Sequence, residues 1–440
     1  MKENEKFNMR ILQELEKKFK VEALTFKGLK VWPIIRSNIY FQYLGKKYDF
    51  DSNKRKYWAA LKSIFYGLRK LLLKKPRYIL FNNTNKRMLI DGKYFDIYFD
   101  SIADTLGQDK CLFIEWSAGS YKPYKKLYSE HVVSDAIFKF ASRIMSYLIR
   151  ASSNKDIKEI CNKFGLHYNY VKDIKTKYSL YILYRYYLKI SNPKKIFLIS
   201  YYTKMPLVIA ANELDIEIIE LQHGLINTSH HGYYTKKKFT EEYYPDKLFA
   251  YGSNLVNSYS DDFIFERNKI FPVGFFYLEY IKKEYKNSYL QELKDKYNQI
   301  ICVTLQNINV SSIIDCVNVL ANKYSEKLFV IRFKKDVTYR SNKKNVVTLN
   351  GYDVYQVLKY SSINITIYST VAIEASFLEV GSVLLNYDGL SEKHLGKMDI
   401  MKNIIDPNML ETLNFDTIEF ESGSKEYFKE NYKSNLKRVI

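Results

Sequence analysis

Short apolar runs separated by polar, helix-forming stretches recur along most of this chain. The clearest run, residues 216–221, is rich in β-branched residues and contains no turn former. That pattern predicts a strand buried in a parallel sheet. Similar runs predict strands at 77–81, 111–115, 195–200, 246–251 and 270–274, with helices at 133–190 and 206–214 between them. Alternation of strands and helices indicates a doubly wound parallel α/β sheet.

The same alternation begins again in the second half of the chain. It predicts strands at 299–305, 328–333, 346–349, 363–367 and 382–386, and helices at 310–324, 353–360 and 371–378. We therefore expect an α/β protein with three parts. These are a helical N-terminal extension (1–75), a first α/β domain (76–278) and a second α/β domain (279–440), whose last helix can cross back to the first.

Residues 54–75 predict one basic amphipathic helix. Apolar residues recur there at the spacing of three and four that places them on one helical face, with Lys62, Arg69 and Lys70 around them. A helix of this kind can lie in an anionic membrane interface. The alternative is that its apolar face packs on the protein core and its lysines are simply solvated.

The composition narrows the classes of partner. The formal net charge is +21, from 69 Lys and Arg against 48 Asp and Glu, which favours an anionic partner. Nucleic acid is not expected, because no zinc finger, RNP motif or helix-turn-helix pattern is present. The four cysteines form no CxxC pair, so we expect neither a zinc site nor a redox site. This cysteine usage fits a protein of a reducing compartment. No signal peptide or membrane-spanning run is evident, which predicts a cytoplasmic protein or one attached to the cytoplasmic face of a membrane.

Histidines gather directly after the predicted strand 216–221. His223, His230 and His231 are three of the six histidines in the chain, and Gln222 and Gly224 flank the first of them. Ligands bind at the carboxyl ends of strands in an open α/β sheet, and histidine can exchange a proton near neutral pH. Gly224 is expected to let the backbone turn and to leave room beside the ring. The alternative is a polar turn in which one histidine caps a helix.

Hydroxyl groups follow a predicted strand of the second domain. Ser369 and Thr370 lie between the strand 363–367 and the helix 371–378, where free backbone N–H groups bind anions. Glu374 lies one turn into that helix, where it can accept hydrogen bonds from a ribose. Plain N-capping is the alternative for the two hydroxyl residues.

Basic residues end another strand of the second domain. Arg332 and Lys334 close the strand 328–333, and arginine suits bidentate contact with phosphate. Gly351 and Tyr352 follow the strand 346–349, where a loop can contact a nucleobase. A surface charge beside a turn is the alternative for Arg332.

Two stretches resemble known enzymes. Residues 367–387, IYSTVAIEASFLEVGSVLLNY, are similar to the donor domain of GT-B glycosyltransferases, except that Glu379 stands where a small residue is usual. The His223-Gly224 dipeptide, with the strand and the Phe-Pro-Val-Gly segment after it, resembles bacterial capsule, teichoic-acid and lipopolysaccharide transferases. The resemblance covers residues 190–390 and implies two Rossmann-like domains facing each other across a cleft.

This resemblance implies a glycosyltransferase that moves a sugar from a nucleotide-activated donor to a hydroxyl of a bacterial surface glycan or its lipid-linked precursor. His223 would be the general base, with Glu115 next in line, and Gln222, His230 and His231 would contact the acceptor. The seven second-domain residues would hold the donor: Arg332, Lys334, Gly351, Tyr352, Ser369, Thr370 and Glu374. GT-B enzymes usually need no metal, so neither a metal nor another cofactor is expected.

Two other functions stay open at this stage. A teichoic-acid-type enzyme would use a similar fold to move a polyol phosphate from a CDP donor. A nucleic-acid-binding protein is the non-enzymatic alternative, based on charge alone. The sequence does not identify the nucleotide, the sugar, the acceptor, the stereochemical outcome or the oligomeric state.

Overall fold

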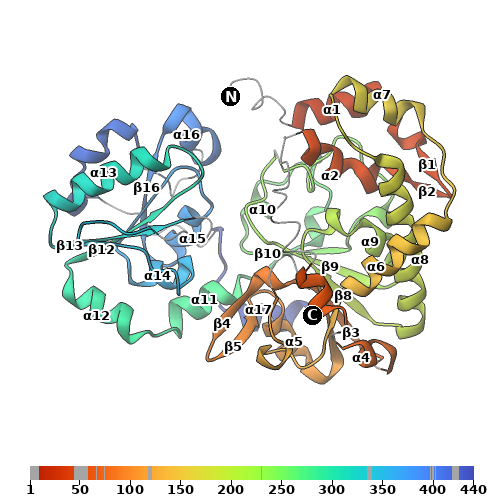
Figure 1. The fold of residues 1–440 in the computed structure, drawn as a ribbon, viewed down its shortest axis with the longest axis horizontal. Helices are drawn as coiled ribbons and strands as arrows, with labels where there is room; N and C mark the ends of the chain where they lie inside the picture. The colour runs from red at the N-terminus through yellow and green to blue at the C-terminus, as the bar shows by residue number, and fades with distance from the viewer. Residues whose placement is uncertain are drawn as a thin grey trace. The chain divides into compact units, whose positions relative to one another are not determined.

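The computed structural model describes residues 9–43, 58–65, 67–73, 75–116, 121–228, 230–333, 339–396, 398, 401, 403–418 and 426–440. The chain divides into two compact units (Figure 1). Unit 1 comprises Met1–Ala250, Leu255–Pro272 and Leu436–Ile440, and unit 2 comprises Tyr251–Asn254 and Val273–Asn435.

Unit 1 is built on a seven-stranded sheet in which every pairing is parallel. In spatial order the strands are β11 (Ile270–Pro272), β10 (Lys247–Ala250), β9 (Glu217–Leu221), β8 (Lys195–Leu198), β3 (Tyr78–Asn83), β6 (Cys111–Trp116) and β7 (Val132–Ser134). The chain enters at β3, adds β6 and β7 on one side, and then adds β8 to β11 on the other. The strand order therefore reverses between β3 and β8, and such a switch point is where open α/β sheets bind ligands.

Helices cover this sheet and contribute to its core. They are α5 (Asp100–Leu106), α6 (Ala136–Leu148), α7 (Lys155–Lys163), α8 (Tyr170–Ser191), α9 (Met205–Asn212) and α10 (Asn254–Asn257). The N-terminal helices α1 (Met9–Lys18) and α2 (Val31–Tyr43) add Leu12, Leu15 and Trp32 to the same hydrophobic core. Two antiparallel pairs complete the unit: β1 (Thr25–Phe26) with β2 (Leu29–Lys30), and β4 (Arg87–Ile90) with β5 (Lys93–Asp96).

The prediction of one helix over residues 54–75 is wrong within the part that the structure describes. Residues 58–63 are helical, a turn follows, and α4 covers only Leu68–Leu73. Gly67 explains the break, because it has a φ of +62° and a Cβ added there would lie 2.2 Å from the carbonyl oxygen of Val132. Residues 54–57 and Lys74 lie outside the described residues.

Unit 2 has a second, six-stranded parallel sheet. Its spatial order is β14 (Val346–Val347), β13 (Lys327–Arg332), β12 (Gln299–Thr304), β15 (Ile363–Thr366), β16 (Gly381–Leu385) and β17 (Ile404–Ile405). The helices are α11 (Phe276–Lys283), α12 (Ser288–Lys296), α13 (Val310–Lys323), α14 (Val354–Tyr360), α15 (Val371–Phe377) and α16 (Leu390–Leu395). The last helix, α17 (Tyr432–Val439), begins in unit 2 and ends in unit 1. The switch point of this sheet lies between β12 and β15.

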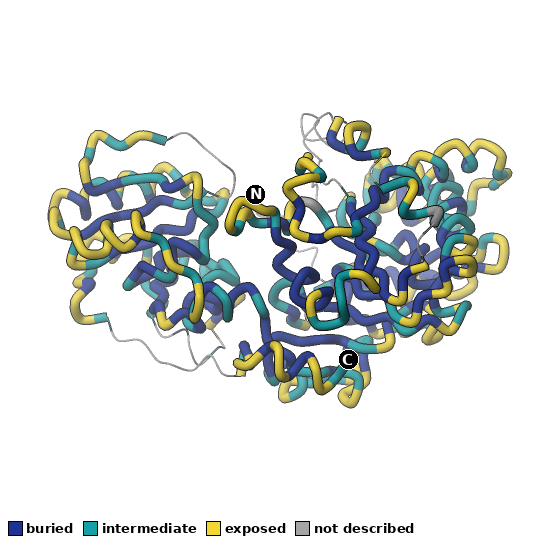
Figure 2. Tube along the Cα trace, turned by 90° about the horizontal axis from the view of Figure 1, so that it is seen from below, coloured by how far each residue is buried: buried dark blue, intermediate teal, exposed yellow. Residues whose placement is uncertain are grey.

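The predicted fold class of two doubly wound α/β domains is confirmed. In each unit the strands are buried between helices whose outer faces are exposed (Figure 2). The sequence did not predict the β4–β5 hairpin or the edge strand β17, since both are short and lack a sustained apolar pattern. Among the described residues, no helix is both long enough and apolar enough to cross a membrane.

Candidate functional site

His223 lies at the carboxyl end of β9, beside the chain that leaves β8. Its Nε2 is 3.0 Å from the hydroxyl oxygen of Ser200, and its ring is 18% exposed. Ser200 has a left-handed backbone conformation, with a φ of 56°, which is uncommon for a residue other than glycine. The loop after β8 therefore holds this hydroxyl against the imidazole at a cost in backbone strain of order 1–3 kcal/mol.

A buried carboxylate explains that strained turn. Glu220 lies inside β9 with no exposed side-chain surface, and it accepts hydrogen bonds from the backbone N–H groups of Ser200 (2.8 Å) and Tyr201 (3.2 Å). It also accepts a hydrogen bond from the hydroxyl of Tyr233. The turn thus aims two N–H groups at a carboxylate that would be costly to bury without partners.

The same contacts assign the proton on the His223 ring. The Tyr233 hydroxyl donates its one proton to Glu220, and its oxygen lies 3.4 Å from Nδ1 of His223. With Tyr233 donating to Glu220, Nδ1 carries the ring proton and donates it to the Tyr233 oxygen. The lone pair is then on Nε2, where it accepts from Ser200. Ser200, His223, Tyr233 and Glu220 form one hydrogen-bonded row.

Burial sets the charges in this row. It lowers the pKa of His223 to about 3, with the neighbouring His230, Lys86 and Lys204 adding to the effect. Burial raises the pKa of Glu220 to about 8, against the opposing effects of the Tyr233 hydrogen bond and of Lys204. His223 is therefore neutral at physiological pH and has an available lone pair.

We expect wild-type unit 1 to lose stability relative to His223→Asn as the pH falls from 7.5 to 5. The unfolded chain protonates this histidine near pH 6.5, whereas the folded protein does so only near pH 3. The contribution of His223 to the free energy of unfolding is thus fully present above pH 6.5 and is lost as the pH falls toward 3. All three tryptophans, Trp32, Trp58 and Trp116, lie in unit 1, so urea unfolding followed by their fluorescence reports on this unit. Parallel pH curves for the two proteins would contradict the lowered pKa.

The other residues predicted for the acceptor are placed around this row. Gln222 is buried, and its side-chain amide donates to the carbonyl of Gly224 at 2.9 Å, which braces the loop. His230 accepts from the backbone N–H of Gly232 at 3.2 Å, and burial lowers its pKa to about 4. His231 is buried and stacks on Tyr40, with ring centres 4.2 Å apart. An acceptor contact from His231 would require this packing to open, so its acceptor role stays a prediction.

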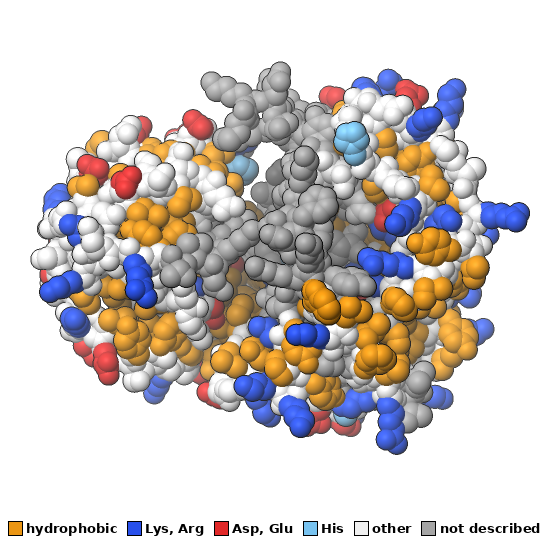
Figure 3. All heavy atoms as spheres, in the orientation of Figure 1, with side chains coloured by type: hydrophobic (Ala, Val, Ile, Leu, Met, Phe, Trp, Pro, Cys, Tyr) orange, Lys and Arg blue, Asp and Glu red, His pale blue; other side chains and the backbone are white. Residues whose placement is uncertain are grey.

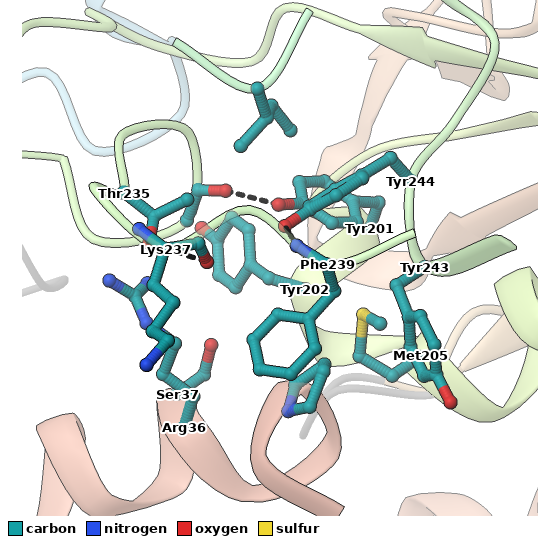
Figure 4. Close-up of a pocket in the computed structure, with 13 residues that line it drawn as sticks. Arg36, Ser37, Tyr201, Tyr202, Met205, Thr235, Lys237, Phe239, Tyr243 and Tyr244 are labelled. Atoms are coloured by element: carbon teal, nitrogen blue, oxygen red, sulfur yellow. Dashed lines mark hydrogen bonds between the residues drawn. The ribbon is translucent and has the colours of Figure 1, made fainter. Parts of the chain in front are cut away.

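The glycine that shapes this loop is Gly232 rather than Gly224. A Cβ at Gly224 would meet nothing within 4 Å, whereas at Gly232 it would lie 2.2 Å from the ring of Tyr202. Beside Gly232 a small cavity of about 30 Å³ lies among aromatic rings that include Tyr201, Tyr202 and Tyr244, with Arg36 and Lys237 at its other side (Figure 4). The loop thus packs tightly against the chain that follows β8.

Glu115, the second candidate base, belongs to a different buried cluster. Its carboxylate accepts hydrogen bonds from Arg87 and, at 2.9 Å, from Asn82. Arg87 also contacts Asp100 at 3.4 Å, and burial raises the pKa of Asp100 to about 7. These contacts favour a structural ion pair for Glu115 over a free base.

In unit 2, Arg332 lies at the end of β13 and holds the loop after β14. Its two terminal nitrogens donate to the carbonyls of Leu349 and, at 2.7 Å, of Tyr352. The Tyr352 ring stacks near Tyr289, with ring centres 6.4 Å apart, and Gly351 is exposed. The structure therefore brings Arg332, Gly351 and Tyr352 together. Lys334 lies outside the described residues.

Ser369, Thr370 and Glu374 lie at the switch point of unit 2. Gln306, which follows β12, accepts from the backbone N–H of Tyr368 at 2.9 Å and so ties the two strand ends together. The Ser369 hydroxyl, one residue before the N-cap, accepts from the N–H of Val371 at 3.3 Å. Thr370 makes no capping hydrogen bond with its side chain, and Glu374 is buried.

Glu379, the residue that departs from the family pattern, has a left-handed backbone with a φ of 63°. A small residue or glycine would suit this conformation better. The Glu379 side chain is exposed and pairs with Lys282 at 3.0 Å.

Sequence reasoning missed Ser200, Glu220 and Tyr233. Glu220 carried a usable signal, because a carboxylate inside an otherwise apolar run must find partners when the strand is buried. Ser200 and Tyr233 carried no sequence signal, since only the three-dimensional fold brings them next to His223.

No protein-family model and no curated protein matches this chain. Several solved structures have a similar backbone. The UDP-GlcNAc 2-epimerase from Methanocaldococcus jannaschii is 13% identical, with a TM-score of 0.48, over 82% of this chain and 98% of that one. The wall teichoic acid polymerase TagF, soaked with CDPG, is 13% identical, with a TM-score of 0.48, over 92% of this chain and 96% of that one. The glycotransferase of kitacinnamycin is 10% identical, with a TM-score of 0.45, over 83% of this chain and 94% of that one. Likeness at this level does not assign an activity, which has to be inferred from the chain's own residues.

Proposed function

We propose that this protein is a glycosyltransferase that moves a sugar from a nucleotide-activated donor to a hydroxyl of a bacterial surface glycan or its lipid-linked precursor. The observation that carries the proposal is the row at the end of β9, in which a neutral His223 is held by Ser200 on one side and by Tyr233 and Glu220 on the other. A neutral imidazole nitrogen held beside a hydroxyl can accept its proton.

In this proposal the acceptor hydroxyl takes the place of the Ser200 hydroxyl at Nε2 of His223. As the hydroxyl attacks the sugar, its proton passes to Nε2 and the ring becomes an imidazolium. Glu220 lies 3.9 Å from Nδ1 and accepts the hydrogen bond of Tyr233, which fixes the ring orientation. Glu220 and Tyr233 are positioning residues in this mechanism.

Unit 2 is proposed to hold the nucleotide. Arg332 would stabilise the charge that develops on the departing phosphate, together with the hydroxyls of Ser369 and Thr370. Glu374 would accept hydrogen bonds from the ribose, and Tyr352 would lie against the base. Independence from metal ions is part of the proposal, because these groups supply the positive charge and the donors.

A thermal-shift panel of UDP, GDP, CMP, CDP and dTDP tests the donor class. We expect one nucleotide to raise the unfolding temperature well above the others, because a ligand that binds only the folded protein stabilises it by mass action. No shift with any of the five would contradict the proposed donor site.

The second candidate is transfer of a polyol phosphate from a CDP donor, which a base in the position of His223 would equally serve. The mass of the product separates the two reactions, since phosphate is retained in the product only in the second. A shift with CDP alone in the nucleotide panel would favour this candidate.

Replacing Arg332 or Glu374 with alanine is expected to weaken nucleotide binding. Loss of a hydrogen bond to a charged group typically costs about 1.5–3 kcal/mol, which is tenfold or more in affinity. Isothermal titration with the nucleotide identified by the panel measures the effect. Arg332→Lys is the useful control, because lysine keeps the charge but cannot hold two carbonyls at once. Unchanged affinity in both folded alanine variants would refute the assignment.

A further inference from the structure

Helix α6 exposes four large apolar side chains. The side chains that point to solvent are large and apolar: Phe140 is 55% exposed, Ile144 56%, Tyr147 79% and Leu148 84%. Their spacing of four, three and one residues places them on one face of the helix. A surface helix of a water-soluble domain normally shows polar residues there.

The buried face of α6 carries Phe138 together with two small hydroxyl residues. Ser142 and Ser146 are buried, and their hydroxyls donate to the carbonyls of Lys139 (2.9 Å) and Arg143 (2.7 Å) within the helix. These local hydrogen bonds satisfy the buried hydroxyl groups. The helix is thus stable in this orientation, and its apolar face is left for another partner.

The segment before α4 extends the same kind of surface. In the helical segment 58–63 and the turn after it, Trp58 (63%), Leu61 (36%) and Phe65 (79%) are exposed. The segment adjoins the start of α6, because the Ser63 hydroxyl lies 3.1 Å from that of Ser134, two residues before the helix. We call these seven apolar residues and the basic residues beside them the α6 face.

Positive charge surrounds these apolar side chains. Lys62, Arg69, Arg143 and Arg150 are exposed, and neither residues 54–75 nor residues 136–155 contain an Asp or a Glu. Figure 3 shows hydrophobic (orange) and basic (blue) side chains next to one another on the visible surface of unit 1. Aromatic and aliphatic side chains among lysine and arginine are the composition of an interfacial membrane-binding surface.

We propose that the α6 face binds the surface of an anionic lipid bilayer. The apolar side chains would enter the headgroup boundary, while the basic side chains would contact the anionic headgroups. A symmetric pairing of two copies through this face is disfavoured, because it would bring the same basic residues together. The inference goes beyond the proposed transfer reaction and does not depend on it.

Sedimentation with vesicles tests the proposal. Wild-type protein should bind vesicles of phosphatidylglycerol and phosphatidylcholine, and should bind pure phosphatidylcholine at least tenfold more weakly. The fourfold variant Phe140→Ser/Ile144→Ser/Tyr147→Ser/Leu148→Ser should lose binding to the mixed vesicles by tenfold or more. A matched variant at exposed apolar positions elsewhere, Leu89→Ser/Val319→Ser/Met409→Ser, should bind like wild type.

A second variant tests whether the basic side chains of the α6 face contribute to vesicle binding. Lys62→Gln/Arg69→Gln/Arg143→Gln/Arg150→Gln should bind the mixed vesicles at least tenfold more weakly, and the salt dependence of its binding should be smaller. Its control replaces four exposed basic residues at other positions with glutamine: Arg267, Lys294, Lys296 and Lys323. Equal loss in the two charge variants would overturn the proposal, because it would show attraction by the net charge alone.

Two further outcomes would also overturn it. One is equal binding of the wild type to neutral and anionic vesicles. The other is a wild-type dimer, seen by analytical ultracentrifugation, that the fourfold serine variant abolishes in a protein that binds no vesicle. All variants should keep the wild-type unfolding temperature and nucleotide-induced thermal shift, so a failure here is distinguishable from a failure of the proposed reaction.

Discussion

His223→Ala is expected to lower kcat by roughly 10²–10⁴-fold, the usual cost of losing a general base. Nucleotide affinity should stay near the wild-type value, because the residues proposed to bind the nucleotide all lie in unit 2. The expectation follows from Nε2 of His223, whose lone pair faces a hydroxyl at 3.0 Å and whose ring is kept neutral by burial. Single-turnover rates and nucleotide titration, measured on the same preparation, separate the two effects.

Two further variants tell proton transfer from positioning. His223→Asn keeps a hydrogen-bond donor, so it should be nearly as slow as alanine if the ring moves a proton, and much faster if the ring only orients the acceptor. Glu220→Gln keeps the shape of the buried carboxyl group but cannot ionise, and should lower kcat less than His223→Ala while leaving KM for the acceptor nearly unchanged. A folded His223→Ala enzyme with near wild-type turnover would refute the catalytic role.

The histidine could be predicted from the sequence because its signal is local. An apolar, β-branched run followed by a polar residue marks a strand end, and strand ends are where α/β sheets bind ligands. Its partners could not be predicted, because Ser200 and Tyr233 come from segments before and after the strand and meet the ring only in three dimensions. The left-handed turn at Ser200 has no sequence signature, since serine is not a residue that prefers this conformation.

Helix α6 illustrates the opposite case. The sequence predicts a helix in this region, and an amphipathic surface helix usually buries its apolar side. Here α8 packs against the side of α6 that carries Phe138, whereas Phe140, Ile144, Tyr147 and Leu148 remain exposed. Periodicity gives the helix and its two faces, but only tertiary packing decides which face is buried. The break at Gly67 has the same origin, because the reason for it is the nearby backbone of Val132.

The largest effect on stability is expected from Arg87→Met. Arg87 has no exposed side-chain surface and is paired with Glu115 and Asp100, while Asp96 lies in the same cluster through Asn82. Removing the arginine leaves these carboxyl groups buried without a cation, which typically costs about 3–5 kcal/mol. Arg267→Met, at an exposed position, is the matched control and should change the free energy of unfolding by less than about 0.5 kcal/mol.

The pH dependence of that loss identifies its cause. Without Arg87 the pKa values of Asp96 and Asp100 should rise further, because its charge opposes the effect of burial on both, and that of Asp100 is already raised to about 7. A carboxyl group whose folded pKa is raised is most favourable to folding below its unfolded pKa near 4, and this contribution is lost as the pH rises through the folded value. The penalty of Arg87→Met should therefore be larger at pH 8 than at pH 5.5. Urea unfolding followed by tryptophan fluorescence measures it in unit 1, and a penalty that is the same at both pH values would show lost packing rather than uncompensated charge.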